Sequence, residues 1–131
     1  MRRLVNHRRM NYQQFLEKKA ITDSPEGIPH GELSGHLFPF QRDIVSWALA
    51  RGRAAIFADC GLGKTLMQLE WARHIPGRVL ILCPLAVAHQ TEHEAATFGI
   101  AGVKHCRSSD TGEKIVVTNY DMIDHFDTSV F

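Results

Sequence analysis

Apolar and polar residues follow two different spacings along this chain, one typical of helices and one typical of buried strands. Apolar positions at helical spacing, bounded by proline and glycine, predict helices over residues 10–21, 39–51, 64–75, 86–98 and 120–126. Short continuous apolar runs predict buried strands over residues 54–58, 79–83, 103–106 and 114–118. Strands and helices alternate from residue 53 onward, so we expect an α/β fold with a mainly parallel sheet.

The chain divides into two parts near residue 34. The first part combines the first predicted helix with an irregular stretch, residues 22–35, that contains two prolines and three glycines. This composition favours a linker over a packed element. We therefore predict a helical extension and linker over residues 1–34, followed by one α/β domain over residues 35–131.

The loop Ala58–Thr65 carries the most specific chemical signal. It follows the predicted strand 54–58 and opens the predicted helix 64–75 with Gly-Lys-Thr, which is the sequence context of a phosphate-binding loop. Gly61 and Gly63 allow the backbone to take positive φ angles and to approach a ligand without a Cβ clash. Successive backbone N–H groups then point into one concavity, and the start of the helix adds its positive dipole end.

Two side chains of this loop supply the chemistry of a P-loop NTPase. Lys64 can reach the β- and γ-phosphates of a nucleotide, and the Thr65 hydroxyl can ligate the accompanying Mg²⁺. The remaining residues of the predicted nucleotide-binding loop are Asp59, Cys60, Gly61, Leu62 and Gly63. The loop therefore predicts a site for a nucleotide with Mg²⁺.

Composition and charge narrow the class of protein. The contents of 44% hydrophobic and 22% charged residues are ordinary for a globular domain, and no apolar run approaches the ~20 residues that span a bilayer. Three cysteines without metal-type spacing fit a reducing compartment, so we expect a cytoplasmic protein without membrane contact.

Residues 1–20 hold six Lys/Arg against one Glu. We interpret this basic arm as a solvated tail, with contact to nucleic-acid phosphates as the alternative.

Four stretches resemble, in order, the motifs of superfamily-two helicases and translocases. Residues 37–41 (Leu-Phe-Pro-Phe-Gln) are similar to the Q motif, residues 59–65 to motif I, residues 80–85 to motif Ia, and residues 116–120 to the strand-and-turn motif that follows it. Motif I is closest to the Swi/Snf-type branch, in which an acidic residue precedes Gly-Leu-Gly-Lys-Thr. Residues 90–99 also resemble the helix after motif Ia in compact phage and prophage helicases.

The resemblance implies an ATP-dependent motor on DNA, built from two RecA-like domains, with ATP and Mg²⁺ as cofactors. It implies that Gln41 reads the adenine edge with Phe38 or Arg42 nearby. It also implies that the loop residues up to Lys64 and Thr65 hold the phosphates and Mg²⁺. The residues implied to contact the nucleic-acid backbone are Pro84, Leu85, Thr118, Asn119 and Tyr120. Backbone contacts suit a motor that moves along any sequence.

The sequence departs from the family pattern after residue 126. The printed residues contain no apolar strand that ends in the Asp-Glu pair of motif II, which holds Mg²⁺ and orients the attacking water. Motif III and the second RecA-like domain do not follow either. We therefore expect the N-terminal piece of a longer helicase, which binds ATP but does not hydrolyse it alone. Two alternatives stay open: a small P-loop kinase or other NTPase, and a non-catalytic remnant that binds nucleotide or nucleic acid.

Overall fold

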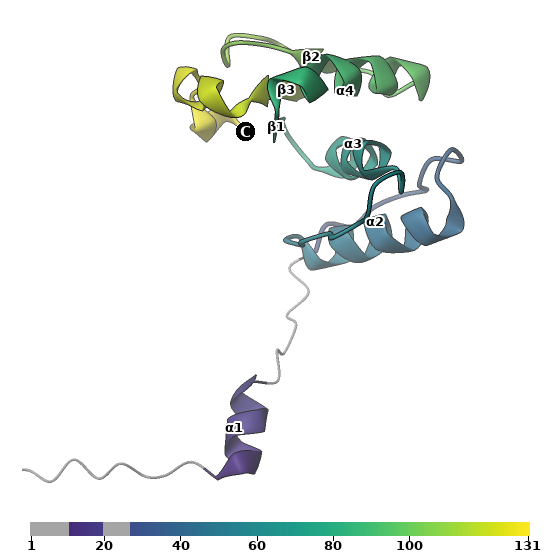
Figure 1. Cartoon of the computed structure of the whole chain (residues 1–131), viewed down its shortest axis with the longest axis vertical. Helices are drawn as coiled ribbons and strands as arrows, with labels where there is room; N and C mark the ends of the chain where they lie inside the picture. Colours follow the sequence, from purple (N-terminus) through teal and green to yellow (C-terminus); the bar gives the residue numbers. More distant parts are fainter. Residues whose placement is uncertain (1–10, 20–26) are drawn as a thin grey trace, which may run out of the picture.

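The structure, a computed structural model, describes residues 11–19 and 27–131. Figure 1 shows the elements in chain order: helices α1 (Tyr12–Lys19), α2 (Pro39–Arg51) and α3 (Lys64–His74), strand β1 (Val79–Cys83), helix α4 (Leu85–Thr97), strands β2 (Val103–His105) and β3 (Ile115–Asn119), and the 3₁₀ helices η1 (Tyr120–His125) and η2 (Thr128–Val130). The helices predicted over residues 39–51, 64–75 and 86–98 are confirmed to within one residue at each end. Of the helix predicted over residues 10–21, the described part is helical over Tyr12–Lys19. Residues 1–10 and 20 of the basic arm and residues 22–26 of the linker lie outside the described residues, and the domain division at residue 34 stays a prediction.

Helix α2 begins and ends where its sequence signals predict. Pro39 is the first helical residue, where its missing N–H leaves no hydrogen bond unmade. Gly52 ends the helix with a φ of 73°, and its N–H donates to the carbonyls of Ala48 and Leu49, both at 3.1 Å. Val45 and Leu49 are fully buried and face the core, whereas Phe40 in the first turn is 42% exposed.

The three strands form one parallel sheet in the order β1-β3-β2, which confirms the predicted parallel arrangement. The central strand β3 is buried along its whole length, as expected for a strand with neighbours on both edges. Its register places Ile115 opposite Val79 on one side and opposite Val103 on the other. Cys83 and Asn119 are register partners at the carboxyl ends of their strands, so the segments that follow them leave the same edge of the sheet.

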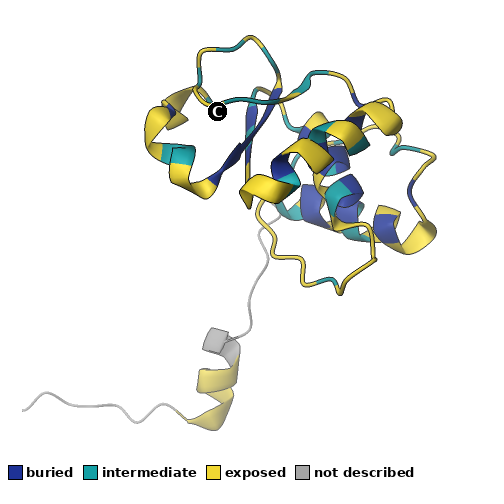
Figure 2. Ribbon diagram, turned by 45° about the horizontal axis from the view of Figure 1, so that its top comes forward, coloured by how far each residue is buried: buried dark blue, intermediate teal, exposed yellow. Residues whose placement is uncertain are grey.

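The core lies between this sheet and three helices. Helix α4 packs against β2 and β3, α3 contacts α4, and α2 packs against α3, so α3 lies between α2 and the sheet with α4 (Figure 1). Figure 2 shows buried residues on the strands and on the sides of the helices that face one another. The core side chains that are 3% exposed or less and belong to one cluster include Leu37, Val45, Leu49, Met67, Leu69, Ala72, Ile81, Ala88, Ala95, Ile115 and Val117.

The predicted strand over residues 54–58 is wrong. Residues 54–59 have no regular secondary structure, and residues 54–57 are exposed, with Phe57 at 96% and Ile56 at 38%. A strand needs a neighbour for its backbone hydrogen bonds, and the sheet of the described residues places none beside this segment. The last predicted helix also differs, because residues 120–125 form the tighter 3₁₀ turn η1.

Across residues 11–19 and 27–131, no helix is long and apolar enough to cross a membrane.

Candidate functional site

The loop between Ala58 and α3 takes a conformation that requires its two glycines. Gly61 and Gly63 have φ angles of 77° and 73°, in the left-handed region that other residues rarely adopt. A Cβ on Gly61 would meet open space, so only the backbone angle selects glycine there. A Cβ on Gly63 would also collide with the side-chain amide of Gln41. The sequence prediction of positive φ at both positions is confirmed.

Helix α3 starts with its N-terminal backbone open toward the loop. Gly63 is the N-cap residue and has no side chain to bond the amides of the first turn. The first N–H groups of a helix lack intrahelical partners and carry the positive end of the helix dipole, so they form a ready anion site. Thr65 lies in this first turn and is half-buried. The described residues contain no group of three His, Cys, Asp or Glu side chains that could hold a metal directly.

Lys64 folds back over the loop that precedes it. Its Nζ donates to the carbonyl oxygens of Ala58 at 3.0 Å and Asp59 at 2.8 Å. The Asp59 carboxylate in turn accepts the backbone N–H of Cys60 at 2.7 Å. The ammonium group therefore already lies at the loop, held by neutral carbonyls that a phosphate can replace with a stronger, charged partner.

Gln41 connects the start of α2 to the phosphate loop. Its side chain is only 4% exposed. The Oε1 atom accepts the backbone N–H of Phe38 at 2.9 Å, and the Nε2 group donates to the carbonyl of Leu62 at 2.9 Å. Both ends of the amide are bonded to backbone, so in this structure Gln41 braces the start of α2 against the loop. The contact with adenine that the resemblance implies for Gln41 stays a prediction. Phe38 is 65% exposed and its ring lies stacked with Phe40, at 6.3 Å between centroids.

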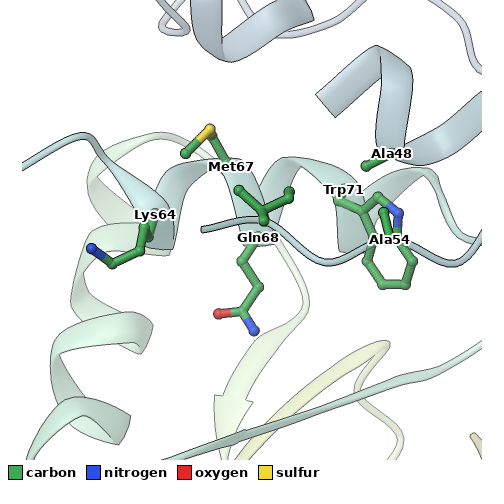
Figure 3. Close-up of a pocket in the computed structure, with 7 residues that line it drawn as sticks. Ala48, Ala54, Lys64, Met67, Gln68 and Trp71 are labelled. Atoms are coloured by element: carbon green, nitrogen blue, oxygen red, sulfur yellow. The ribbon is translucent and has the colours of Figure 1, made fainter. Parts of the chain in front are cut away.

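A separate apolar cavity of about 350 Å³ lies beside the loop. Residues of α2, of α3 and of the irregular segment before the loop line it. Figure 3 labels Ala48, Ala54, Lys64, Met67, Gln68 and Trp71, and Ile56 completes the lining. Neither Phe38 nor Gln41 lines it, so this cavity is distinct from the surface on which the sequence predicts the nucleobase.

The residues predicted to contact nucleic acid meet at one edge of the sheet. Pro84 and Leu85 follow β1, and Tyr120 follows β3, whose last residue Asn119 is the register partner of Cys83. Pro84 is exposed, and Leu85 and Tyr120 are more than half exposed, whereas Asn119 is 9% exposed.

Thr118 differs from the other residues of this group. It is fully buried, and its hydroxyl has no hydrogen-bond partner among the described residues. In this conformation the Thr118 side chain does not reach the surface, so the predicted direct contact with nucleic acid does not fit its burial near the carboxyl end of β3.

A buried carboxylate that the sequence analysis did not single out lies near the middle of α3. Glu70 is fully buried and forms a salt bridge with Arg73, whose Nε lies 2.7 Å from its Oε2. Its Oε1 accepts the backbone N–H of Ser34 at 2.8 Å and lies 3.2 Å from Nε2 of His74. Burial by itself would raise the pKa of Glu70, but the hydrogen bonds from Arg73, Ser34 and His74 outweigh it and hold the pKa below its ordinary value.

This lowered pKa predicts a specific loss of stability in acid. A carboxyl group with a lower pKa in the folded state stabilises the fold while it is ionised, and that stabilisation disappears as the pH falls through the folded pKa. We expect the thermal midpoint of the wild type to exceed that of Glu70→Gln at neutral pH. The difference should shrink below about pH 4.3, the ordinary pKa of a glutamate. Thermal melts of both proteins between neutral and acid pH measure it, and a difference independent of pH would contradict the prediction.

Comparison with known proteins adds a partial match to a curated relative. No family model matches the chain. A stretch of 86 residues is 31% identical to the Caenorhabditis elegans protein named SWI/SNF-related matrix-associated actin-dependent regulator of chromatin subfamily A-like protein 1 homolog. The match covers 63% of this chain and 12% of that relative. This similarity supports a relationship to Swi/Snf-type proteins, and the mixed α/β fold with its small parallel sheet is compatible with part of a RecA-like domain.

Proposed function

We propose that this chain binds ATP with Mg²⁺ through the loop Ala58–Thr65. The observation that carries the proposal is the loop itself: two glycines at positive φ, Lys64 lying against the loop, and an uncapped helix start. These features fit a triphosphate, because the backbone amides and the ammonium group together offer donors and positive charge at one place. Thr65 and the phosphate oxygens would hold the Mg²⁺.

We further propose that the chain is the ATP-binding part of a DNA helicase or translocase. The four motif-like stretches and the Swi/Snf-type relative support this class. Leu85 and Tyr120 offer exposed side chains at the same sheet edge, where they suit contact with a nucleic-acid strand. A second RecA-like domain would supply the groups that the family places across the nucleotide.

A direct titration tests the nucleotide proposal. Isothermal calorimetry of the purified chain with Mg-ATP should show saturable binding with one nucleotide per chain. The same titration without Mg²⁺ should be weaker, because the cation neutralises the phosphates and bridges them to Thr65. No heat of binding in either titration would contradict the proposal.

Hydrolysis separates the motor from the alternatives. The printed residues contain no Asp-Glu pair, so we expect the chain to bind Mg-ATP with negligible turnover, in the presence or absence of DNA. A phosphate-release assay with and without single-stranded and duplex DNA measures this. Rapid turnover without DNA would favour a small P-loop kinase or another NTPase. Turnover that DNA stimulates would support the motor class but contradict the predicted inactivity of the isolated chain.

A further inference from the structure

A continuous set of contacts connects the middle of α3 to the segment that carries Phe38 and Gln41. Glu70 makes the connection, because its Oε1 accepts the backbone N–H of Ser34 at 2.8 Å. Ser34 lies 36 positions earlier in the chain, just before the turn that leads into α2. A fully buried carboxylate on a helix thus adds a hydrogen bond to a backbone segment that Leu33 and Leu37 also anchor by packing against the core.

The turn after Ser34 connects this segment to Phe38, which bonds Gln41 beside the phosphate loop. The N–H of Leu37 donates to the carbonyl of Ser34 at 3.3 Å, and the Leu37 side chain is 3% exposed. The next residue, Phe38, bonds Gln41, which in turn bonds Leu62 in the loop. Because α3 itself begins in that loop, the contacts close a ring from the loop through α3, across to Ser34 and back to the loop.

Arg73 fixes the direction in which the Glu70 carboxylate points. Its Nε donates to Oε2 at 2.7 Å and its Nη2 donates to Oε1 at 2.8 Å, a paired geometry that holds the carboxylate plane. The same Nη2 lies 3.5 Å from the carbonyl oxygen of Glu32, next to the segment that Glu70 holds. Oε2 accepts from Arg73, whereas Oε1 accepts from both Arg73 and Ser34. This arrangement needs two acceptor oxygens on one side chain, which only a carboxylate offers.

We propose that Glu70 is a positioning residue for recognition of the nucleobase. It fixes the segment Ser34–Phe38 relative to the phosphate loop, so that the exposed ring of Phe38 meets the base while the loop, braced by Gln41, holds the phosphates. The inference rests on the proposed binding of ATP. It assigns to Glu70 a part in selecting a nucleoside triphosphate over the bare polyphosphate, without contact to either.

Two ligands separate positioning from stability. The affinities of Mg-ATP and of Mg-tripolyphosphate are measured by calorimetry for the wild type, Glu70→Met and Glu70→Gln. Methionine fills the same volume without an acceptor, whereas glutamine keeps one oxygen for Ser34. We expect Glu70→Met to lose roughly tenfold in affinity for Mg-ATP, a change of ~1.4 kcal/mol, with the affinity for Mg-tripolyphosphate unchanged. Glu70→Gln should fall between the wild type and Glu70→Met.

A second glutamate variant, Glu94→Gln, is the control for the Glu70 variants. Glu94→Gln removes a carboxylate on α4 whose hydrogen bond to Gln90 is exposed, and it should leave both affinities unchanged. Equal losses for both ligands in Glu70→Met, or no loss for either, would overturn the positioning role alone. A wild-type chain that binds neither ligand would overturn the proposed function, and the inference with it.

Amide exchange tests the same inference without a variant, should Glu70→Met fail to fold. Hydrogen exchange at the Ser34 amide is followed by NMR in the wild-type chain alone, with Mg-ATP and with Mg-tripolyphosphate. We expect Mg-ATP to slow this exchange more than Mg-tripolyphosphate does, because contact between the base and Phe38 tightens the segment that Glu70 holds. Equal exchange rates with the two ligands would contradict the proposal.

Discussion

Replacing Lys64 with alanine should remove most of the affinity of this chain for Mg-ATP. Hydrogen bonds to charged groups contribute about 1.5–3 kcal/mol each, so we expect a roughly 10- to 150-fold weaker affinity. The side chain is exposed and bonds only the carbonyls of Ala58 and Asp59 among the described residues. Its loss should therefore leave the thermal midpoint of the ligand-free chain nearly unchanged.

Calorimetric titration with Mg-ATP and a thermal melt of each protein measure the two effects. Lys104→Ala is the matched control, because it removes an exposed lysine from β2, away from the phosphate loop. It should change neither the affinity nor the melt. Lys64→Ala with wild-type affinity would show that the loop does not hold the phosphates in the proposed way.

The sequence was sufficient to predict local structure at residues whose own backbone preferences determine the conformation. Pro39 and Gly52 fixed the ends of α2, and the positive φ angles at Gly61 and Gly63 followed from the loop sequence. The strands β1 and β3 were also predictable, since each is a continuous apolar run that the sheet then buries. In these elements the local preference and the tertiary packing agree.

The segment over residues 54–58 shows where such reasoning ends. An apolar run predicts that a segment is buried. It does not predict whether another strand lies beside that segment to form backbone hydrogen bonds with it. In the described residues no strand of the sheet lies beside residues 54–58. The side chain of Phe57 is accordingly 96% exposed. The strand prediction failed because pairing is a property of two segments.

Glu70 was missed for a related reason. Arg73 and His74 follow it at the helical spacings of three and four residues, which is a signal of a local charge pair that could have been read. Its third partner, the backbone N–H of Ser34, comes from 36 positions earlier, and only the tertiary structure reveals it. From the sequence alone, Glu70 is therefore interpreted as an ordinary glutamate on the solvent-exposed face of a helix.

Replacing Gly63 with alanine should disturb both the fold and the binding of Mg-ATP. A side chain at a φ of 73° is strained, and the left-handed conformation costs roughly 1–2 kcal/mol for residues other than glycine. The added Cβ would also collide with the Gln41 amide, so the bond between Gln41 and Leu62 must shift. A domain of about this size loses roughly 4–8 °C in thermal midpoint for each kcal/mol of destabilisation.

Four further variants, among them Gln41→Ala alone, separate the two causes of the Gly63→Ala effect, with thermal melts and Mg-ATP titrations as the measurements. Gly61→Ala carries the same backbone strain without a collision, since its Cβ meets open space at a φ of 77°. It should therefore be the milder variant. Gly112→Ala has neither feature and should behave as the wild type. The double variant Gly63→Ala with Gln41→Ala removes the collision partner, so it should melt closer to Gly61→Ala than the sum of its single changes predicts. Strict additivity of the two changes would show that Gln41 does not brace the loop through this contact.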